Sequence, residues 1–215
     1  MAGRKHPAVA LRGDDLLRQR ITQEAARIMA EEGVSDFAAA KRKAAARLNQ
    51  AENRHLPSNR EIEAALADYL QLFHARRLPQ TLHHLLGHAL EAMRLLAAFE
   101  PRLTGPLLNG VATPYSEVVL HAFADDAEQI AALLERHAIP FDQTSRRLRY
   151  GRDRQDNVPV FRFVAGDTPI EICALPPAGL REAPLSAVDA RPMRRANLKE
   201  VERLLQDAAR QQPSL

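Results

Sequence analysis

Apolar residues recur every three or four positions in the first hundred residues, which is the spacing of one face of a helix. The pattern predicts four amphipathic helices, at about residues 14–33, 36–48, 58–77 and 81–99. Ser58 and Glu61 form an S-x-x-E capping box at the start of the third helix, and Pro79 separates it from the fourth. Residues 1–100 therefore predict a helical array.

After Pro101 the apolar runs become short, as is typical of strands. We expect strands at about residues 118–122, 147–150, 159–164 and 169–174, with a helix following the first of them. A last helix is expected at Asn197, where Glu200 completes a second capping box. The predicted fold is α+β, with a helical region over 1–100 and a small mixed-sheet domain plus C-terminal helix over 101–215.

The stretch from Leu103 to Ala124, LTGPLLNGVATPYSEVVLHAFA, resembles the signature of the nucleotidyltransferase fold. In that signature a Gly-Ser pair, a short helical turn and a second glycine precede Ser-Asp-x-Asp on a strand. Here Gly105-Pro106 stands at the Gly-Ser pair, Gly110 at the second glycine, and the segment from Ser116 to Val119 at Ser-Asp-x-Asp. With the order of the predicted elements, the resemblance covers about residues 88–176.

The resemblance implies a metal-dependent nucleotide site. In the family, carboxylates two apart on a strand point to one face and hold magnesium ions against a triphosphate. By this resemblance Glu117 and Glu171 would be the catalytic and metal-binding carboxylates, and His121, on the Glu117 face, a further metal ligand. The nucleotide-binding residues would be Gly105, Gly110 and Ser116. The implied cofactor is Mg²⁺ or Mn²⁺, and the implied partner is a nucleoside triphosphate.

Two departures weaken that site. Val119 replaces the second carboxylate, and Pro106 removes both a hydroxyl and a backbone N–H donor. We therefore expect a degenerate site that binds a nucleotide with a divalent cation, and transfer of a nucleotidyl group to an unknown acceptor stays open. The alternative is a non-catalytic regulatory or interaction module.

Arginines near the predicted strand at 147–150 are further candidates for phosphate contacts. They are Arg146, Arg147, Arg149, Arg152 and Arg154. A solvated basic hairpin explains them equally well.

Positive charge is concentrated near the start of the chain. Residues 1–60 hold 12 Lys and Arg against 7 Asp and Glu, whereas residues 61–215 hold 18 against 20. Residues 18–48 also show a weak resemblance to the opening of a TetR-type DNA-binding domain. A nucleic-acid or protein partner would then contact Lys41, Arg42, Lys43 and Arg47. The alternative is that these side chains form the solvated face of a packed helix.

Histidines on the predicted fourth helix form a second candidate. His84, His88 and Glu91 lie at i, i+4 and i+7 on one face, which is the geometry that a metal site needs. Because nothing in the sequence marks this face as buried, we expect a solvated surface. Cys173, the one cysteine, lies in an apolar strand and is expected to be a buried structural thiol.

Composition sets the remaining expectations. The chain has 215 residues, of which 46% are hydrophobic, and no apolar run approaches 18 residues. Its first 15 residues turn polar too soon for a signal peptide, so a cytoplasmic protein without a membrane partner is expected. Homo-oligomerisation stays open. The segments DFAAAKRKAA, LPSNREIEAAL and RPMRRANLKEVERLL resemble a group of uncharacterised bacterial proteins, which implies no activity.

Overall fold

The computed structural model describes residues 13–50, 56–151 and 153–211, so the candidate Arg152 lies outside the described residues. Its helices are α1 (Gly13–Glu32), α2 (Phe37–Arg47), α3 (Asn59–Phe73), α4 (Leu78–Leu95), α5 (Glu128–Arg136) and α6 (Leu198–Arg210). Its strands are β1 (Arg102–Thr104), β2 (Val118–Phe123), β3 (Asp142–Tyr150), β4 (Arg154–Ala165), β5 (Thr168–Leu175) and β6 (Arg195–Ala196). Short 3-10 helices occupy η1 (Ala97–Phe99), η2 (Pro106–Asn109) and η3 (Pro177–Leu180). The α+β fold class is therefore confirmed.

The chain divides into two compact units, Met1–Leu66 and Ala67–Leu215. The sequence had placed its division near residue 100, whereas the contacts assign α4 to the same unit as the sheet. The physical reason is that α4 packs on α6 and on β1, β2 and β5. None of the described helices is both long and apolar enough to cross a membrane.

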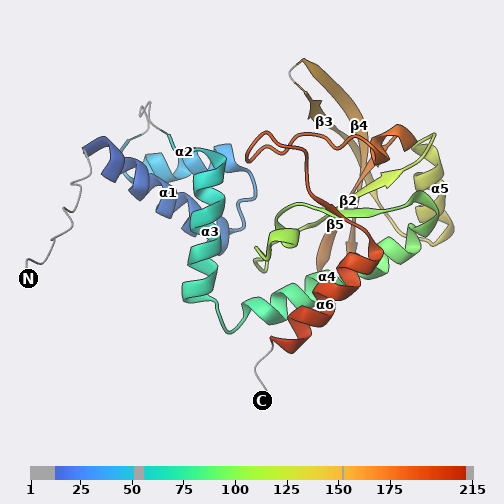
Figure 1. Cartoon of the computed structure of the whole chain (residues 1–215), viewed down its shortest axis with the longest axis horizontal. Coiled ribbons are helices and arrows are strands. Elements are labelled where there is room, and N and C mark those ends of the chain that lie inside the picture. The colour runs from blue at the N-terminus through green and yellow to red at the C-terminus, as the bar shows by residue number, and fades with distance from the viewer. Residues whose placement is uncertain (1–12, 51–55, 152, 212–215) are drawn as a thin grey trace, which may run out of the picture. The chain divides into compact units, whose positions relative to one another are not determined.

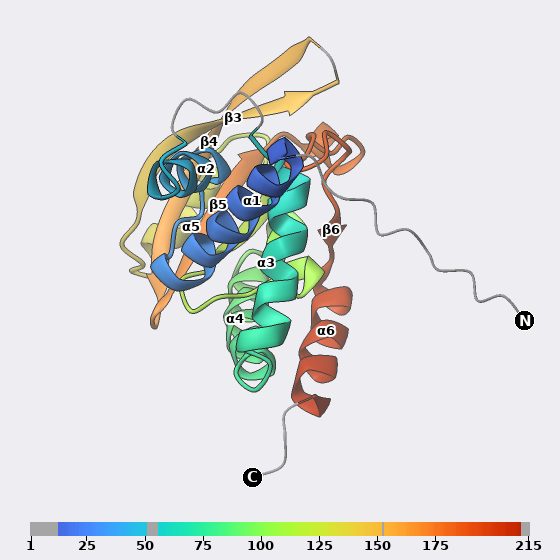
Figure 2. The same cartoon turned by 90° about the vertical axis from the view of Figure 1, so that its left-hand side faces the viewer.

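Two helix caps and an ion pair between helices are found in the first unit. Asp36 accepts a hydrogen bond from the Ala39 backbone N–H and so caps α2. The predicted box before α3 forms, because the Ser58 backbone N–H donates to Glu61 at 2.8 Å. Arg18 on α1 forms an ion pair with Glu61, and Figure 2 shows α1 beside the first half of α3.

A six-stranded sheet in the order β3-β4-β5-β2-β1-β6 organises the second unit. The pair β2–β5 is parallel, and the other pairs are antiparallel. Figure 1 shows α4 and α6 packed side by side, and the β3–β4 hairpin reaching past the other strands. Asn197 and Glu200 form the predicted capping box of α6. The mixed sheet with a C-terminal helix is thus as expected.

Side chains alternate between the two faces of this sheet. Val118 and Leu120 of β2 face the main core, to which α4, α5 and α6 contribute their apolar sides. Phe123 of β2 faces the other way, into a smaller cluster with Cys173 and residues of β3 and β4. The described sheet therefore has a helix-covered face and a second face, called here the carboxylate face because it carries Glu117 and Glu171.

Several boundaries differ from those predicted. The third helix ends at Phe73 rather than at Arg77, and Pro79 lies inside the first turn of α4, where a missing N–H costs nothing. Strand β4 begins at Arg154 rather than at about residue 159, because β3 and β4 pair from Tyr150↔Arg154 onward. Polar residues on an edge hairpin gave no apolar alternation by which to recognise these strands.

Candidate functional site

Two glycines shape the backbone of the loop between β1 and β2. Gly105 and Gly110 flank η2 and have φ of 88° and 71°, values that favour glycine. Between them Pro106 opens η2 and supplies neither a hydroxyl nor an N–H. The two glycines thus shape the loop, but donors for a phosphate must come from elsewhere.

Glu171 lies beside the strand that follows this loop. The strands β2 and β5 run parallel, with Val119 in register with Glu171. Glu117 precedes β2 by one residue and alternates onto the same face as Val119. Val119, which stands where the Ser-Asp-x-Asp pattern has its second aspartate, is therefore an apolar residue directly opposite Glu171.

Two arginines form ion pairs with the carboxylate of Glu171, whose side chain is fully buried. Arg146 of β3 donates to Glu171 Oε2 at 2.8 Å. Arg162 of β4 donates to the same oxygen twice, from Nε at 2.9 Å and from a terminal nitrogen at 2.7 Å. Such charge-assisted bonds compensate for burying the carboxylate. Glu171 is consequently an ion-pair partner rather than a free metal ligand.

Glu117, unlike Glu171, has no arginine bound to its carboxylate among the described residues. Its side chain is partly buried, and it forms no hydrogen bond or ion pair with any residue that the structure describes. Burial and the neighbouring Glu171 carboxylate raise the pKa of Glu117, although the charges of Arg146 and Arg162 act in the opposite direction. The structure thus brings the two predicted carboxylates within electrostatic reach but leaves only Glu117 free.

His121 lies on the same face and is 1% exposed. Burial, with the charges of Arg195 and Arg146, lowers the pKa of His121 to about 4. Its Nδ1 is buried and has no hydrogen-bond partner among the described residues. Its imidazole is therefore neutral at pH 7, but the nearby guanidinium groups oppose the approach of a cation.

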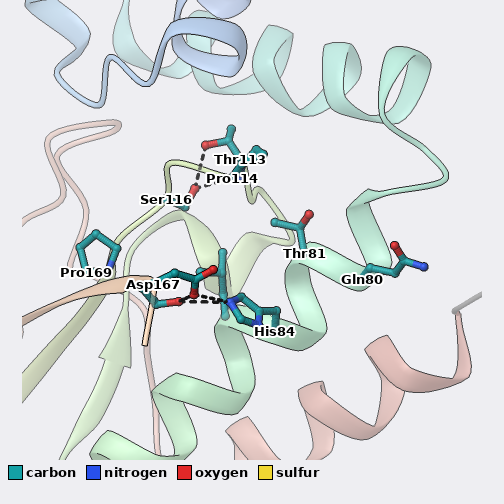
Figure 3. Close-up of a pocket in the computed structure, with 10 residues that line it drawn as sticks. Gln80, Thr81, His84, Thr113, Pro114, Ser116, Asp167 and Pro169 are labelled. Carbon is teal, nitrogen blue, oxygen red and sulfur yellow. Dashed lines mark hydrogen bonds and ion pairs between the residues drawn. The ribbon is translucent and has the colours of Figure 1, made fainter. Parts of the chain in front are cut away.

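Ser116 turns away from Glu117 into a pocket of about 350 Å³ on the α4 side of the sheet. The lining residues are Gln80, Thr81, His84, Leu85, Thr113, Pro114, Ser116, Asp167, Thr168 and Pro169. Figure 3 shows His84 of α4 pointing toward Asp167, and their closest atoms, Nε2 and Oδ1, are 2.7 Å apart. The Ser116 hydroxyl accepts a hydrogen bond from the Thr113 backbone N–H at 2.9 Å. This predicted nucleotide ligand is therefore separated from the carboxylate face.

The basic residues of α2 are largely engaged within the first unit. Lys43 pairs with Glu32 at 2.6 Å, and Arg47 pairs with both Glu32 and Glu24. Burial lowers the pKa of Lys41. Arg42, by contrast, is exposed and forms no ion pair within the described part of the chain. The positive charge available to a nucleic acid is thus smaller than the sequence implied.

Sequence reasoning missed two of the residues that shape these sites. Arg162 follows Val158 and Val160 in a period-two pattern, so an arginine on the same sheet face as Glu171 was a readable signal. Asp167 lies in the turn between β4 and β5. Its proximity to α4 depends on tertiary packing that no local pattern reports.

Comparisons with protein-family models, curated proteins and solved structures yield no significant match to this chain.

Proposed function

We propose that this chain is a nucleotidyltransferase-like protein with a degenerate active site, which binds a nucleotide with one divalent cation, Mg²⁺ or Mn²⁺, on its carboxylate face. Support comes from the order of the elements: a glycine-flanked turn, a strand directly preceded by Glu117, a helix, and a later strand that brings Glu171 alongside. The observation that carries the proposal is the partly buried, unpaired carboxylate of Glu117 beside a pair of arginines. A carboxylate whose pKa is raised by burial and by a neighbouring carboxylate is more common at functional sites than elsewhere.

The residues present fit one cation and not two. Glu117 supplies a carboxylate oxygen, which is the ligand type that Mg²⁺ prefers, and Mg²⁺ commonly takes its remaining ligands from phosphates and water. Val119 offers no ligand, and the Glu171 oxygens are held by Arg146 and Arg162. Binding is accordingly the function that the geometry supports best, and two-metal nucleotidyl transfer is not.

The arginines supply the complementary charge. The side chains of Arg146 and Arg162 are 37% and 50% exposed, so each guanidinium retains surface for another ligand while holding Glu171. Arginine binds phosphate oxygens through planar pairs of N–H donors. A triphosphate can thus contact the arginines with its oxygens while its cation meets Glu117.

Calorimetric titration with each of the four nucleoside triphosphates tests the proposal, with and without Mg²⁺ or Mn²⁺. The wild-type chain should bind at least one of them in a metal-dependent manner. Glu117→Gln should weaken that binding about tenfold or more, the equivalent of one charge-assisted contact. The matched control is Glu135→Gln, an exposed glutamate on α5, which should bind as the wild type does.

Folding of the variant is checked in the same preparation. Because burial raises the pKa of Glu117, its ionised form destabilises the fold at pH values above that pKa, and the penalty disappears as the group is protonated. Glu117→Gln should therefore be at least as thermally stable as the wild type at pH 7. Metal-dependent binding that is equal in the wild type and Glu117→Gln, or absent from a folded wild type, would refute the site.

A further inference from the structure

The cluster of His84, His88 and Asp167 lies on the helix-covered side of the sheet and has no part in the carboxylate face. One ligand atom from each of the three residues lies within 4.8 Å of the others. His84 and His88 are one helical turn apart on α4, and Asp167 comes from the turn between β4 and β5. We propose that these three side chains bind one zinc-class divalent ion, which links α4 to the β4–β5 turn.

The donor set selects the class of metal. Two imidazole nitrogens and one carboxylate oxygen suit Zn²⁺, which also accepts a water or another ligand as its fourth partner. Mg²⁺ and Ca²⁺ prefer oxygen ligands throughout, so this cluster discriminates against them. The site is therefore chemically distinct from the one proposed around Glu117.

The observed geometry is close to that of a bound state. In a tetrahedral zinc site with bonds of about 2.0–2.1 Å, neighbouring ligand atoms are about 3.3 Å apart. The His84 Nε2 to Asp167 Oδ1 distance is 2.7 Å, and the widest separation in the cluster is within 4.8 Å. Shifts of roughly 1 Å would convert the hydrogen bond into two metal bonds, and exposed side chains such as His84 can make them.

His88 is held in place by its surroundings. A Cβ at Gly166 would lie 3.2 Å from the His88 ring, so the absence of a side chain lets the turn approach the imidazole. His88 Nδ1 is buried without a hydrogen-bond partner among the described residues, and the nearest carboxylate oxygen, of Glu91, is 4.0 Å away. Metal-bound histidines commonly direct their second nitrogen toward such a carboxylate. Glu91 would thus be a positioning residue rather than a ligand.

The fourth coordination position can open toward the adjoining pocket. His84 and Asp167 both line that pocket, together with the hydroxyl-bearing Thr81, Thr113, Ser116 and Thr168. A water or a small anion completing the zinc sphere would meet hydroxyl groups there. The two histidines have the spacing of the H-E-x-x-H motif of zinc proteases, but Leu85 stands where that motif has its glutamate general base. The proposed site therefore lacks the group with which those proteases activate water.

The test uses the full chain without a histidine tag, stripped of metal and titrated with Zn²⁺ against a chromogenic chelator. We expect one tight site per chain and a rise in melting temperature on zinc addition, since a ligand that binds only the folded state stabilises it. Co²⁺ serves as a spectroscopic probe, and its visible absorption should indicate tetrahedral coordination. His84→Ala and Asp167→Asn should each weaken zinc binding more than about 100-fold. The loss of a residue that only hydrogen-bonds to a metal ligand already lowers metal affinity by about 10–100-fold, and these variants lose a ligand itself.

His83→Ala is the matched control, since it removes a neighbouring histidine on the same helix but outside the cluster. It should bind zinc as the wild type does and show the same thermal shift. Circular dichroism of each metal-free variant establishes that it is folded. Zinc binding that is weak or absent in the wild type, or that survives equally in His84→Ala and Asp167→Asn, would overturn the proposal.

Discussion

Replacement of His121 by leucine should make the protein's stability less sensitive to a fall in pH from about 7 to about 5. His121 is buried on the carboxylate face, and burial together with Arg195 and Arg146 lowers its pKa to about 4. Because the unfolded chain has the higher pKa, it binds the proton first as the pH falls. The stability contributed by neutral His121 is therefore complete above the unfolded pKa and is lost as the pH falls from about 6.5 toward 4.

The magnitude follows from proton linkage. With pKa values of about 6.5 unfolded and about 4 folded, the wild type should lose about 2 kcal/mol between pH 7 and pH 5 through this residue alone, and about 3 kcal/mol by pH 4. Leucine cannot titrate and has a similar volume. It also removes the Nδ1 that is buried without a hydrogen-bond partner among the described residues, so the variant should be within about 1 kcal/mol of the wild type at pH 7.

Urea denaturation at pH 7 and pH 5 measures the effect. The sequence contains no tryptophan, so far-ultraviolet circular dichroism is the appropriate signal. A control variant, His137→Gln, replaces an exposed histidine in the same unit and should retain the acid loss because His121 is intact. If His121→Leu and the wild type lose equal free energies of unfolding between the two pH values, the burial argument for His121 is wrong.

Three further predictions follow from the contacts of single side chains. Arg162→Gln should lower the free energy of unfolding by about 1–3 kcal/mol, because the buried Glu171 loses charged donors; urea denaturation measures this, and a change below about 0.5 kcal/mol would contradict it. Cys173 should resist alkylation by iodoacetamide in the folded chain and react on unfolding, since burial raises its pKa to about 12; rapid native labelling would contradict its placement. Arg47→Ala should lower the melting temperature by less than about 4 °C, because its pairs with Glu32 are exposed to solvent; a drop of more than about 8 °C would show that the ion pairs are stronger than surface pairs.

Local signals in the sequence located most helices of the described chain. The boxes at Ser58 and Asn197 marked helix starts correctly, because capping is decided by residues within one turn of each other. Apolar spacing on α4 was equally informative, since Leu86, Leu90 and Met93 are all buried. In these segments local preference and tertiary packing favour the same structure.

The strands and the sites depended more on long-range pairing. The three residues of β1 and the two of β6 are too short to show a period, and their pairing is what makes them strands. The sequence placed Glu171 on a strand, and in the structure that strand pairs in parallel with β2. The ion pair between Arg162 and Glu171 depends on strand register, and the contact between Asp167 and His84 depends on how α4 packs against the sheet. Local sequence patterns encode neither.

The separation of Ser116 from Glu117 has a consequence for both proposals. These consecutive residues open on opposite sides of the sheet, one into the pocket with His84 and Asp167, the other toward Glu171. The two proposed sites share no side chain, so their binding free energies should be additive. Zinc should leave nucleotide affinity unchanged, and Glu117→Gln should leave zinc affinity unchanged. Calorimetric titration of nucleotide into zinc-loaded and zinc-free protein measures the coupling directly. A change of about tenfold or more would mean that β2 and β5 transmit about 1.4 kcal/mol between their two faces, and the sites would then have to be treated as one.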